Sequence, residues 1–316
     1  MKLLITRPMT DAVMERARTE FDAEIRKETS PLTPDEMRRA LTEFDVVMPT
    51  LGDLFSAQVF ADVSDPRCKL LANFGVGYNH IDVDAASASG IAVTNTPGAV
   101  TDATADIAMT LLLTTARRVG EGERVVRAGG WHGWHPAQML GHHVTGKRVG
   151  IVGMGRIGQA IARRCHFGFS MQVAYQSRSA KELEFPAEFV PDLSTLAASV
   201  DFLVLAVPGG AETQHLINAP VLEAMNPNAL LINIARGEVV DEAALIAALQ
   251  SGQIAGAGLD VYEFEPKVPQ ALIDMENVTL CPHLGTATDE VRTDMGYLAL
   301  DNVAAFIAGR ALLTPV

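Results

Sequence analysis

Short β-rich runs alternate with helix-patterned segments along almost the whole chain. The runs form two series, at residues 2–6, 45–48, 68–73 and 92–95, and then at 148–152, 171–175, 202–207, 229–234, 257–261 and 278–281. Strands that alternate with helices build parallel sheets with helices on both faces. Two such series predict two α/β domains.

Three helix patterns add detail to this outline. Residues 11–21 place apolar side chains at helical spacing. Residues 101–120 predict one long helix, with Thr101 or Asp102 as N-cap, that continues into the charged residues 121–127. Residues 288–309 predict an amphipathic helix that ends at Gly309.

The charge balance excludes some classes of partner. The chain has 38 Asp and Glu residues against 25 Lys and Arg, a net charge of −13, which argues against nucleic-acid and anionic-membrane binding. No uncharged stretch reaches membrane-spanning length, and the short apolar run after Met1 does not fit a signal peptide. Three cysteines without a C-x-x-C pair suggest no disulfide framework. We therefore expect a reducing, cytoplasmic compartment.

The stretch V152-G-M-G-R-I-G158 follows one predicted strand and opens a predicted helix. In such a turn Gly153 permits the tight bend, Gly155 lets the backbone approach a pyrophosphate, and Gly158 lets the helix pack on the strand. The amides of Arg156 and Ile157 would then lie at a helix N-terminus, where an anion is favoured. The pattern predicts a dinucleotide-binding domain.

Four further stretches share an order and spacing with this turn: N73-F-G-V-G-Y-N-H-I-D82, N233-I-A-R-G237, G258-L-D-V-Y-E-F-E265 and C281-P-H-L-G-T-A-T288. Together they resemble the D-isomer-specific 2-hydroxyacid dehydrogenases over nearly the whole chain. The segment G129-G-W-H-G-W-H135 most resembles the glyoxylate/hydroxypyruvate reductases within that family.

The resemblance implies a Rossmann-type dinucleotide-binding domain, residues 100–285, inserted in a smaller flavodoxin-like substrate domain, residues 1–99 and 286–316. It also implies a homodimer formed through the long helix and the segment after it.

The resemblance implies three catalytic residues. His283 matches the proton donor, and its titration range suits general acid work near neutral pH. Glu265 matches the carboxylate that binds this histidine and favours its charged form. Arg236 matches the arginine that binds the substrate carboxylate. The backbone N–H groups of Val76 and Gly77 would complete the capture of that carboxylate.

Other residues are expected around the substrate. The loop of residues 48–55 is predicted to line the pocket, with Met48 and Leu51 facing the substrate side chain. Trp134 is expected to be either a buried anchor at a dimer interface or, as the resemblance implies, a residue that reaches into the partner's substrate pocket. Four nearby histidines have no closed zinc-ligand spacing, so we predict no metal site: His132, His135, His142 and His143.

The resemblance assigns Ile234, Ala235 and Asp260 to the cofactor, with Asp260 at the nicotinamide carboxamide.

An acid normally ends the second strand of such a domain and binds the ribose hydroxyls. Here Gln176 is followed by Ser177, Arg178 and Ser179, which suit a 2′-phosphate. We expect NADPH as cofactor, with weaker use of NADH.

The sequence leaves other functions open. The chain could act on aryl-pyruvates, D-lactate or 3-phosphoglycerate, or be a dinucleotide-sensing protein like the family's transcriptional corepressors. Formate oxidation is disfavoured because Glu265 stands where those enzymes have glutamine.

Overall fold

The computed structural model describes all residues, 1–316, and divides the chain into two compact units. Unit 1 comprises residues 1–100 and 286–316, and unit 2 comprises residues 101–285. Each unit contains one fully parallel sheet, of five and seven strands respectively. The predicted fold, a dinucleotide-binding domain inserted in a smaller α/β domain, is confirmed. No helix is long and apolar enough to cross a membrane.

The sheet of unit 1 has the order β2-β1-β3-β4-β5, a flavodoxin-like arrangement. Its strands are β1 (Lys2–Ile5), β2 (Asp22–Ile25), β3 (Val46–Met48), β4 (Leu70–Ala72) and β5 (Ala92–Thr94). Its helices are α1 (Asp11–Glu20), α2 (Pro34–Glu43), α3 (Ala57–Ala61), α4 (Val83–Ala88) and α12 (Asp289–Ile307). Apolar side chains of α1 and α12 cover one face, and those of α2, α3 and α4 cover the other.

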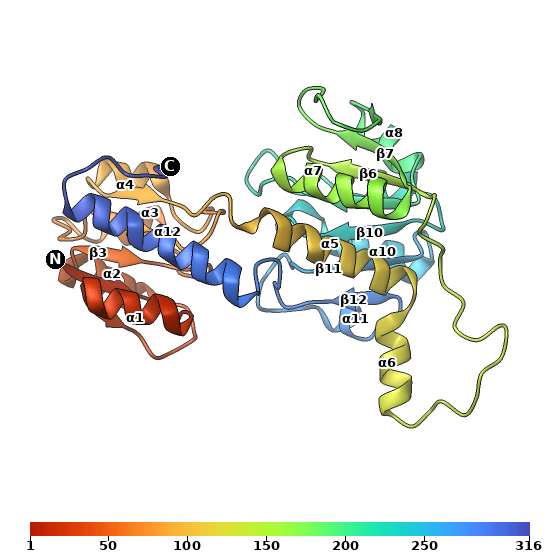
Figure 1. Cartoon of the computed structure of the whole chain (residues 1–316), viewed down its shortest axis with the longest axis horizontal. Coiled ribbons are helices and arrows are strands. Elements are labelled where there is room, and N and C mark those ends of the chain that lie inside the picture. The colour runs from red at the N-terminus through yellow and green to blue at the C-terminus, as the bar shows by residue number, and fades with distance from the viewer. The chain divides into compact units, whose positions relative to one another are not determined.

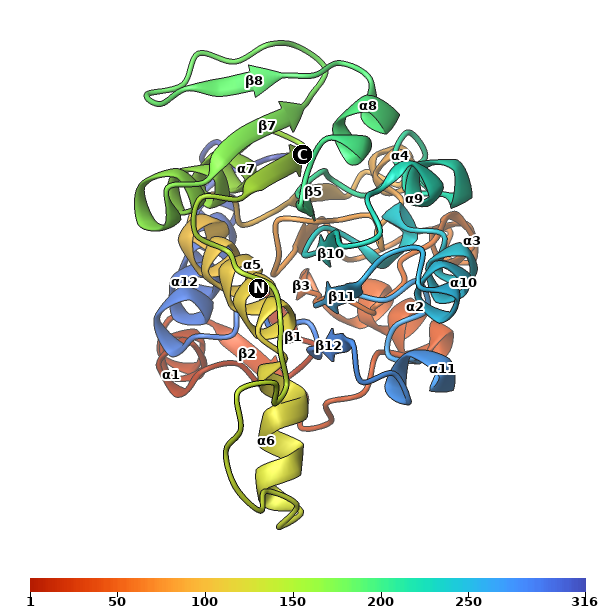
Figure 2. The same cartoon turned by 90° about the vertical axis from the view of Figure 1, so that its right-hand side faces the viewer.

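The sheet of unit 2 has the order β12-β11-β10-β9-β6-β7-β8, so β8 and β12 form its two edges (Figure 2). Its strands are β6 (Arg148–Val152), β7 (Gln172–Gln176), β8 (Ala187–Phe189), β9 (Phe202–Leu205), β10 (Leu230–Asn233), β11 (Gly256–Leu259) and β12 (Val278–Leu280).

Helices cover both faces of this sheet. The helices of unit 2 are α5 (Val100–Ala116), α6 (Val119–Arg127), α7 (Arg156–Arg163), α8 (Leu193–Ala198), α9 (Ala219–Ala224), α10 (Glu242–Ser251) and α11 (Gln270–Ile273), and of these α6 has no buried residue. Short π-helical and 3₁₀ segments occupy Arg164–Gly168 and Gly237–Val239. Side chains of α5 and α7 pack on one face, and those of α8, α9 and α10 pack on the other.

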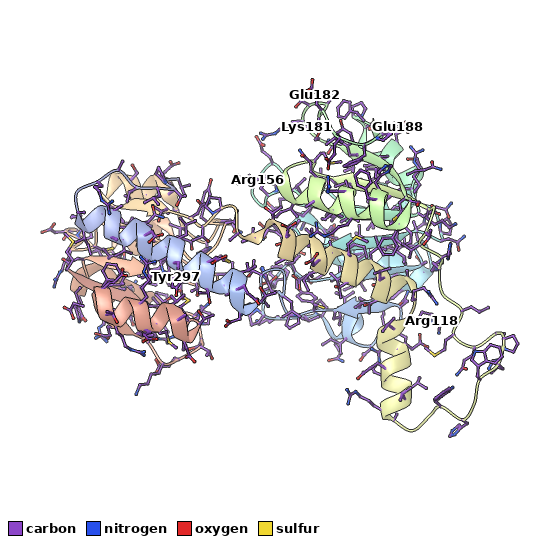
Figure 3. The ribbon with its side chains drawn as sticks, in the orientation of Figure 1. Arg118, Arg156, Lys181, Glu182, Glu188 and Tyr297 are labelled. Atoms are coloured by element: carbon purple, nitrogen blue, oxygen red, sulfur yellow. The ribbon has the colours of Figure 1, made fainter.

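The long helix predicted after residue 100 is interrupted. Its two parts, α5 and α6, meet at Arg118, which adopts a left-handed conformation with φ 51° (Figure 3). The prediction of a single long helix through residue 120 and beyond was therefore wrong. In contrast, α1 and α12 match the prediction, and the Thr288 side chain caps α12 by accepting from the Val291 N–H group.

The turn between β6 and α7 has almost no free space. Gly153 has φ 98°, and a Cβ there would lie 2.7 Å from the carbonyl group of Ala206, just beyond β9. A Cβ on Gly158 would lie 2.0 Å from the Gly153 carbonyl oxygen. The two glycines therefore set how closely α7 packs on its sheet, as the sequence pattern predicts.

Gly158→Ala should lower the free energy of unfolding by about 1–3 kcal/mol, because the added methyl forces the helix away from the strand. The matched control is Gly168→Ala, where a Cβ meets no atom within 4 Å. Urea denaturation measures both. Equal stability of the two variants would show that the packing is not as tight as described.

Candidate active site

The order of the strands in unit 2 reverses between β6 and β9, and ligands bind parallel α/β sheets at such a point. Gly155 is the N-cap of α7, and no side chain caps the first turn. A Cβ on Gly155 would meet nothing within 4 Å, so the space beside the exposed N–H groups is open. The positive end of the helix and this open cradle fit a pyrophosphate, with Arg156 exposed beside it.

The loop after β7 has a defined shape. The Ser177 hydroxyl donates to the Ser179 carbonyl oxygen at 2.6 Å, and the buried Tyr175 hydroxyl accepts from the Lys181 N–H group at 2.8 Å. Arg178 is exposed. The Lys181 ammonium donates to the Ser179 hydroxyl at 3.3 Å (Figure 3), which places a second cation in the loop. Sequence reasoning missed Lys181, although a cation three residues beyond Arg178 was a signal for it.

His283 and Glu265 form a pair. His283 follows β12 and Glu265 follows β11, the neighbouring strand. The Nδ1 atom of His283 lies 2.9 Å from Oε2 of Glu265, and the other carboxylate oxygen accepts from the Tyr262 N–H group at 3.1 Å. A carboxylate at Nδ1 selects the tautomer that donates from this atom, so Nε2 is the ring atom left for a substrate.

The charge of Glu265 follows from its surroundings. Burial raises the pKa of the Glu265 carboxyl, but the hydrogen bond and charge of His283 outweigh burial and hold that pKa below its usual 4.5. The carboxylate is therefore ionised at neutral pH. The stabilisation that it adds is lost only as the pH falls through the lowered pKa.

Asp260 holds the loop on which His283 lies. Its buried carboxylate accepts from the N–H groups of Leu284 at 2.6 Å and Gly285 at 2.8 Å. Its carbonyl oxygen accepts from the His283 N–H group at 2.9 Å. Burial raises the pKa of the Asp260 carboxyl, against the effect of the Leu284 bond. The contact with the nicotinamide that the sequence analysis assigned to Asp260 stays a prediction. The structure shows in addition that Asp260 holds the loop of His283.

Arg236 follows β10 and lies close to the pair. A Cβ on Gly237 would fall 1.8 Å from the carbonyl carbon of Tyr262, so the Arg236 loop packs directly against the backbone that leads to Glu265. Burial lowers the pKa of the Arg236 guanidinium, and the charges of Glu238 and Glu265 oppose this effect. An arginine stays charged under such conditions. Unit 2 thus brings one fixed cation, one carboxylate and one histidine together.

Ile234 and Ala235, between β10 and Arg236, are buried in the cores of unit 2. Their side chains face protein, the Ala235 N–H group donates to Oδ1 of Asn233 at 3.0 Å, and the Ala235 carbonyl oxygen accepts from Arg236 at 2.7 Å.

The turn in unit 1 that contains Val76 and Gly77 is tied through its carbonyl groups. The Asn73 amide donates to the carbonyl oxygens of Gly75 at 3.1 Å and Gly77 at 3.0 Å. The Asn95 amide donates to that of Val76 at 2.9 Å. The N–H groups of Val76 and Gly77 make no hydrogen bond within the protein.

The prediction for Met48 needs correction. Met48 is fully buried in the core of unit 1, because both faces of β3 are covered by helices, so its side chain does not face a substrate. Leu51, in the next loop, is partly exposed. This loop is held by the buried carboxylate of Asp53, which accepts from Thr6, Leu32, Thr50 and Arg7. The sequence offered no signal that singled out Asp53.

Trp134 is among the most exposed large side chains, at 78%. His132 and His135 are also exposed, and no group of three or more His, Cys, Asp or Glu residues is arranged to hold a metal ion. The three cysteines are free thiols.

Comparison with known proteins agrees with this arrangement. A sequence model of the D-isomer specific 2-hydroxyacid dehydrogenase NAD-binding domain matches residues 109–285. The glyoxylate reductase of Thermococcus onnurineus is 44% identical over 315 residues, covering 98% of this chain and 93% of the relative. The glycerate dehydrogenase of Hyphomicrobium methylovorum is 37% identical over 312 residues, covering 98% of this chain and 96% of the relative.

Solved structures are also similar. The NADPH-dependent glyoxylate/hydroxypyruvate reductase of Sinorhizobium meliloti, in complex with NADP and malonate, has a TM-score of 0.87 and 39% identity, covering 100% of this chain and 96% of the other. A D-isomer specific 2-hydroxyacid dehydrogenase from Polaromonas has a TM-score of 0.93 and 36% identity, covering 100% and 99%. The chain belongs to the D-isomer specific 2-hydroxyacid dehydrogenase family, and residues 109–285 are its NAD-binding domain.

Proposed function

We propose that this protein reduces small 2-oxo acids, with glyoxylate and hydroxypyruvate as the preferred class, and that His283 is the proton donor. The observation that supports this most is the His283–Glu265 pair beside Arg236, in the same unit as the dinucleotide cradle. The names of the relatives, glyoxylate reductase and glycerate dehydrogenase, point to the same substrates.

In the proposed reaction, a hydride is added to the carbon and a proton to the oxygen of a carbonyl group. A nicotinamide cofactor, which the turn of Gly153, Gly155 and Gly158 would hold, would supply the hydride for the carbonyl carbon. The His283 Nε2–H group donates its proton to the carbonyl oxygen, which completes the hydroxyl group. Glu265 orients the ring through the bond to Nδ1, which directs Nε2 toward the substrate. Arg236 binds the substrate carboxylate through its planar guanidinium.

Two further residues are proposed for the carboxylate. The uncommitted N–H groups of Val76 and Gly77 would donate to the substrate carboxylate. A two-carbon or three-carbon acid has few other polar groups, so binding depends heavily on these bonds.

We propose NADPH as the preferred cofactor. The end of β7 has no acid that would repel a 2′-phosphate, and the loop after it contains Ser177, Arg178 and Ser179. Lys181 adds a second cation to the same loop. Charge-assisted hydrogen bonds from these groups favour the phosphorylated cofactor.

We propose a homodimer formed through α6 and residues 128–147. Figure 1 shows that α6 and the segment after it project away from the rest of unit 2. No residue of α6 is buried, and Val126, Trp131 and Leu140 expose more than half of their surface. Such exposed apolar side chains are typical of an interface, and a second copy of this chain is the partner that we propose for it. Trp134 would reach the substrate pocket of that copy.

Mixing the protein with NADPH and glyoxylate should lower the nicotinamide absorbance, and His283→Ala should lower kcat by a factor of about 10²–10⁴ through loss of the general acid. Cofactor affinity should barely change. Near wild-type turnover of the variant at neutral pH would refute the assignment of His283. Absence of turnover of any 2-oxo acid by the wild type would instead favour a dinucleotide-sensing protein.

The kcat/KM for NADPH should exceed that for NADH by at least about tenfold, since one charge-assisted bond is worth roughly 1.5–3 kcal/mol. Arg178→Ala should remove most of this preference through KM, and Gln176→Asp should shift it toward NADH by repelling the phosphate. Equal use of both cofactors by the wild type at low, equal concentrations would contradict the proposal.

Trp134→Ala should change KM and the preference among 2-oxo acids while sedimentation still shows a dimer. If Trp134 is only an interface anchor, the variant should dissociate, with activity following the dimer content. Unchanged kinetics together with unchanged mass would exclude both tasks.

A further inference from the structure

Unit 2 contains a second histidine–glutamate pair. The Nε2 atom of His215 lies 2.8 Å from Oε1 of Glu263, two residues before Glu265. The His215 side chain is 39% exposed and that of Glu263 is 15% exposed, so the contact is shielded mainly on the glutamate side. The proposed reaction does not use this pair.

The backbone of His215 is tied to the segment that follows Arg236. Its N–H group donates to the Glu238 carbonyl oxygen at 2.7 Å, and the Ile217 N–H group donates to that of Val239 at 3.0 Å. Ile217 also forms a parallel β-bridge with Val240. The segment of residues 215–217 therefore lies alongside residues 238–240.

The side chain of Glu263 is tied to a third segment. Its Oε2 atom accepts from the Glu242 N–H group at 3.4 Å, and its own N–H group donates to Oε2 of Glu242 at 3.4 Å. The backbone of Gly237 also packs closely on the backbone of Tyr262 and Glu263, so the two segments touch at this point as well. His215 thus joins the Arg236 segment through its backbone and the Glu265 segment through its ring.

The backbone conformation of His215 has a cost. Its φ of 50° is in the left-handed region, which residues other than glycine adopt rarely. Asparagine or glycine would adopt it more easily, but neither has a ring that reaches Glu263. The conformation is explained if the ring contact itself is useful.

We propose that His215 and Glu263 are a positioning pair, which fixes the Arg236 segment relative to the Glu265 segment and so aligns the carboxylate-binding group with the proton donor. The proposal rests on the proposed function, because it assigns a task within that reaction. His215 itself touches no reacting atom.

The charges around His215 give the pair a pH dependence. Glu263 faces the ring, Asp241 lies near it, and Glu242 and Glu238 are on the adjoining segments, with Arg236 as the cation nearby. The hydrogen bond to Glu263 raises the pKa of His215 above 6.5, and this effect outweighs the opposing effect of desolvation. The stabilisation from the charged His215–Glu263 pair is therefore fully present below pH 6.5. It is lost as the pH rises through the raised pKa of His215.

The test compares His215→Ala, His215→Gln and Glu263→Gln with the wild type. A glutamine at 215 keeps an N–H donor for Glu263 but does not titrate. Glu188→Gln is the matched control, since it removes the partner of Arg148 between β6 and β8, on a different part of the same unit (Figure 3).

His215→Ala and Glu263→Gln should each lower kcat/KM for glyoxylate by about tenfold, whereas NADPH affinity and the melting temperature should match those of the control. His215→Gln should restore activity to within about threefold and remove one ionisation from the alkaline limb of the pH profile. A loss of activity that simply follows lost stability or lost NADPH affinity, or equal activity of His215→Ala and Glu188→Gln, would overturn the proposal.

A second readout is independent of turnover. The NMR resonances of the His283 ring report its hydrogen bond to Glu265 in the free protein, and they should shift in His215→Ala but not in Glu188→Gln. Unshifted resonances would overturn the positioning proposal even in an active enzyme. Inactivity of the wild type toward all 2-oxo acids, with shifted resonances, would instead reject only the proposed function.

Discussion

The candidate site depends on one buried carboxylate. The Asp260 side chain accepts hydrogen bonds from the backbone N–H groups of the two residues that follow His283. The Asp260 carbonyl oxygen accepts a third hydrogen bond, from the N–H group of His283 itself. Bonds to a charged acceptor are stronger than those to a neutral one, so the loop is held although His283 has a left-handed φ of 55°. Without this anchor the imidazole would have no fixed position relative to Glu265.

The sheet of unit 2 explains how residues distant in sequence come together. β10, β11 and β12 are neighbours, and their register aligns Asn233 with Leu259 and Leu259 with Leu280. The three strands therefore end at the same level. The loops after them contain Arg236, Glu265 and His283, so a cation, a carboxylate and a proton donor converge at the carboxyl edge where such sheets bind ligands. His215 reaches the same edge from the loop after β9.

Much of this arrangement could be predicted from the sequence, because strands buried on both faces are nearly continuous apolar runs. The edge strands β2 and β8 escaped prediction because acidic residues, Asp22 and Glu188, break their apolar pattern, whereas the edge strands β5 and β12 have no acidic residue and were predicted. The break falls at Arg118, a residue that rarely adopts a positive φ, and the nearest glycine, Gly120, lies two residues later inside α6, so the sequence did not mark the position of the break. Met48 was assigned to the substrate as part of the loop of residues 48–55, whereas it is the last residue of β3 and is buried in the core that α1 and α12 share.

The pairing of His283 with Glu265 is the central claim, and a double-mutant cycle on kcat/KM tests it most directly. Glu265→Gln, His283→Gln and the double variant would be compared with the wild type for NADPH-dependent glyoxylate reduction. If Glu265 acts through His283, the double variant should be no slower than His283→Gln alone, within about a factor of two. Losses that multiply in the double variant would mean that the two residues act independently, which contradicts the account.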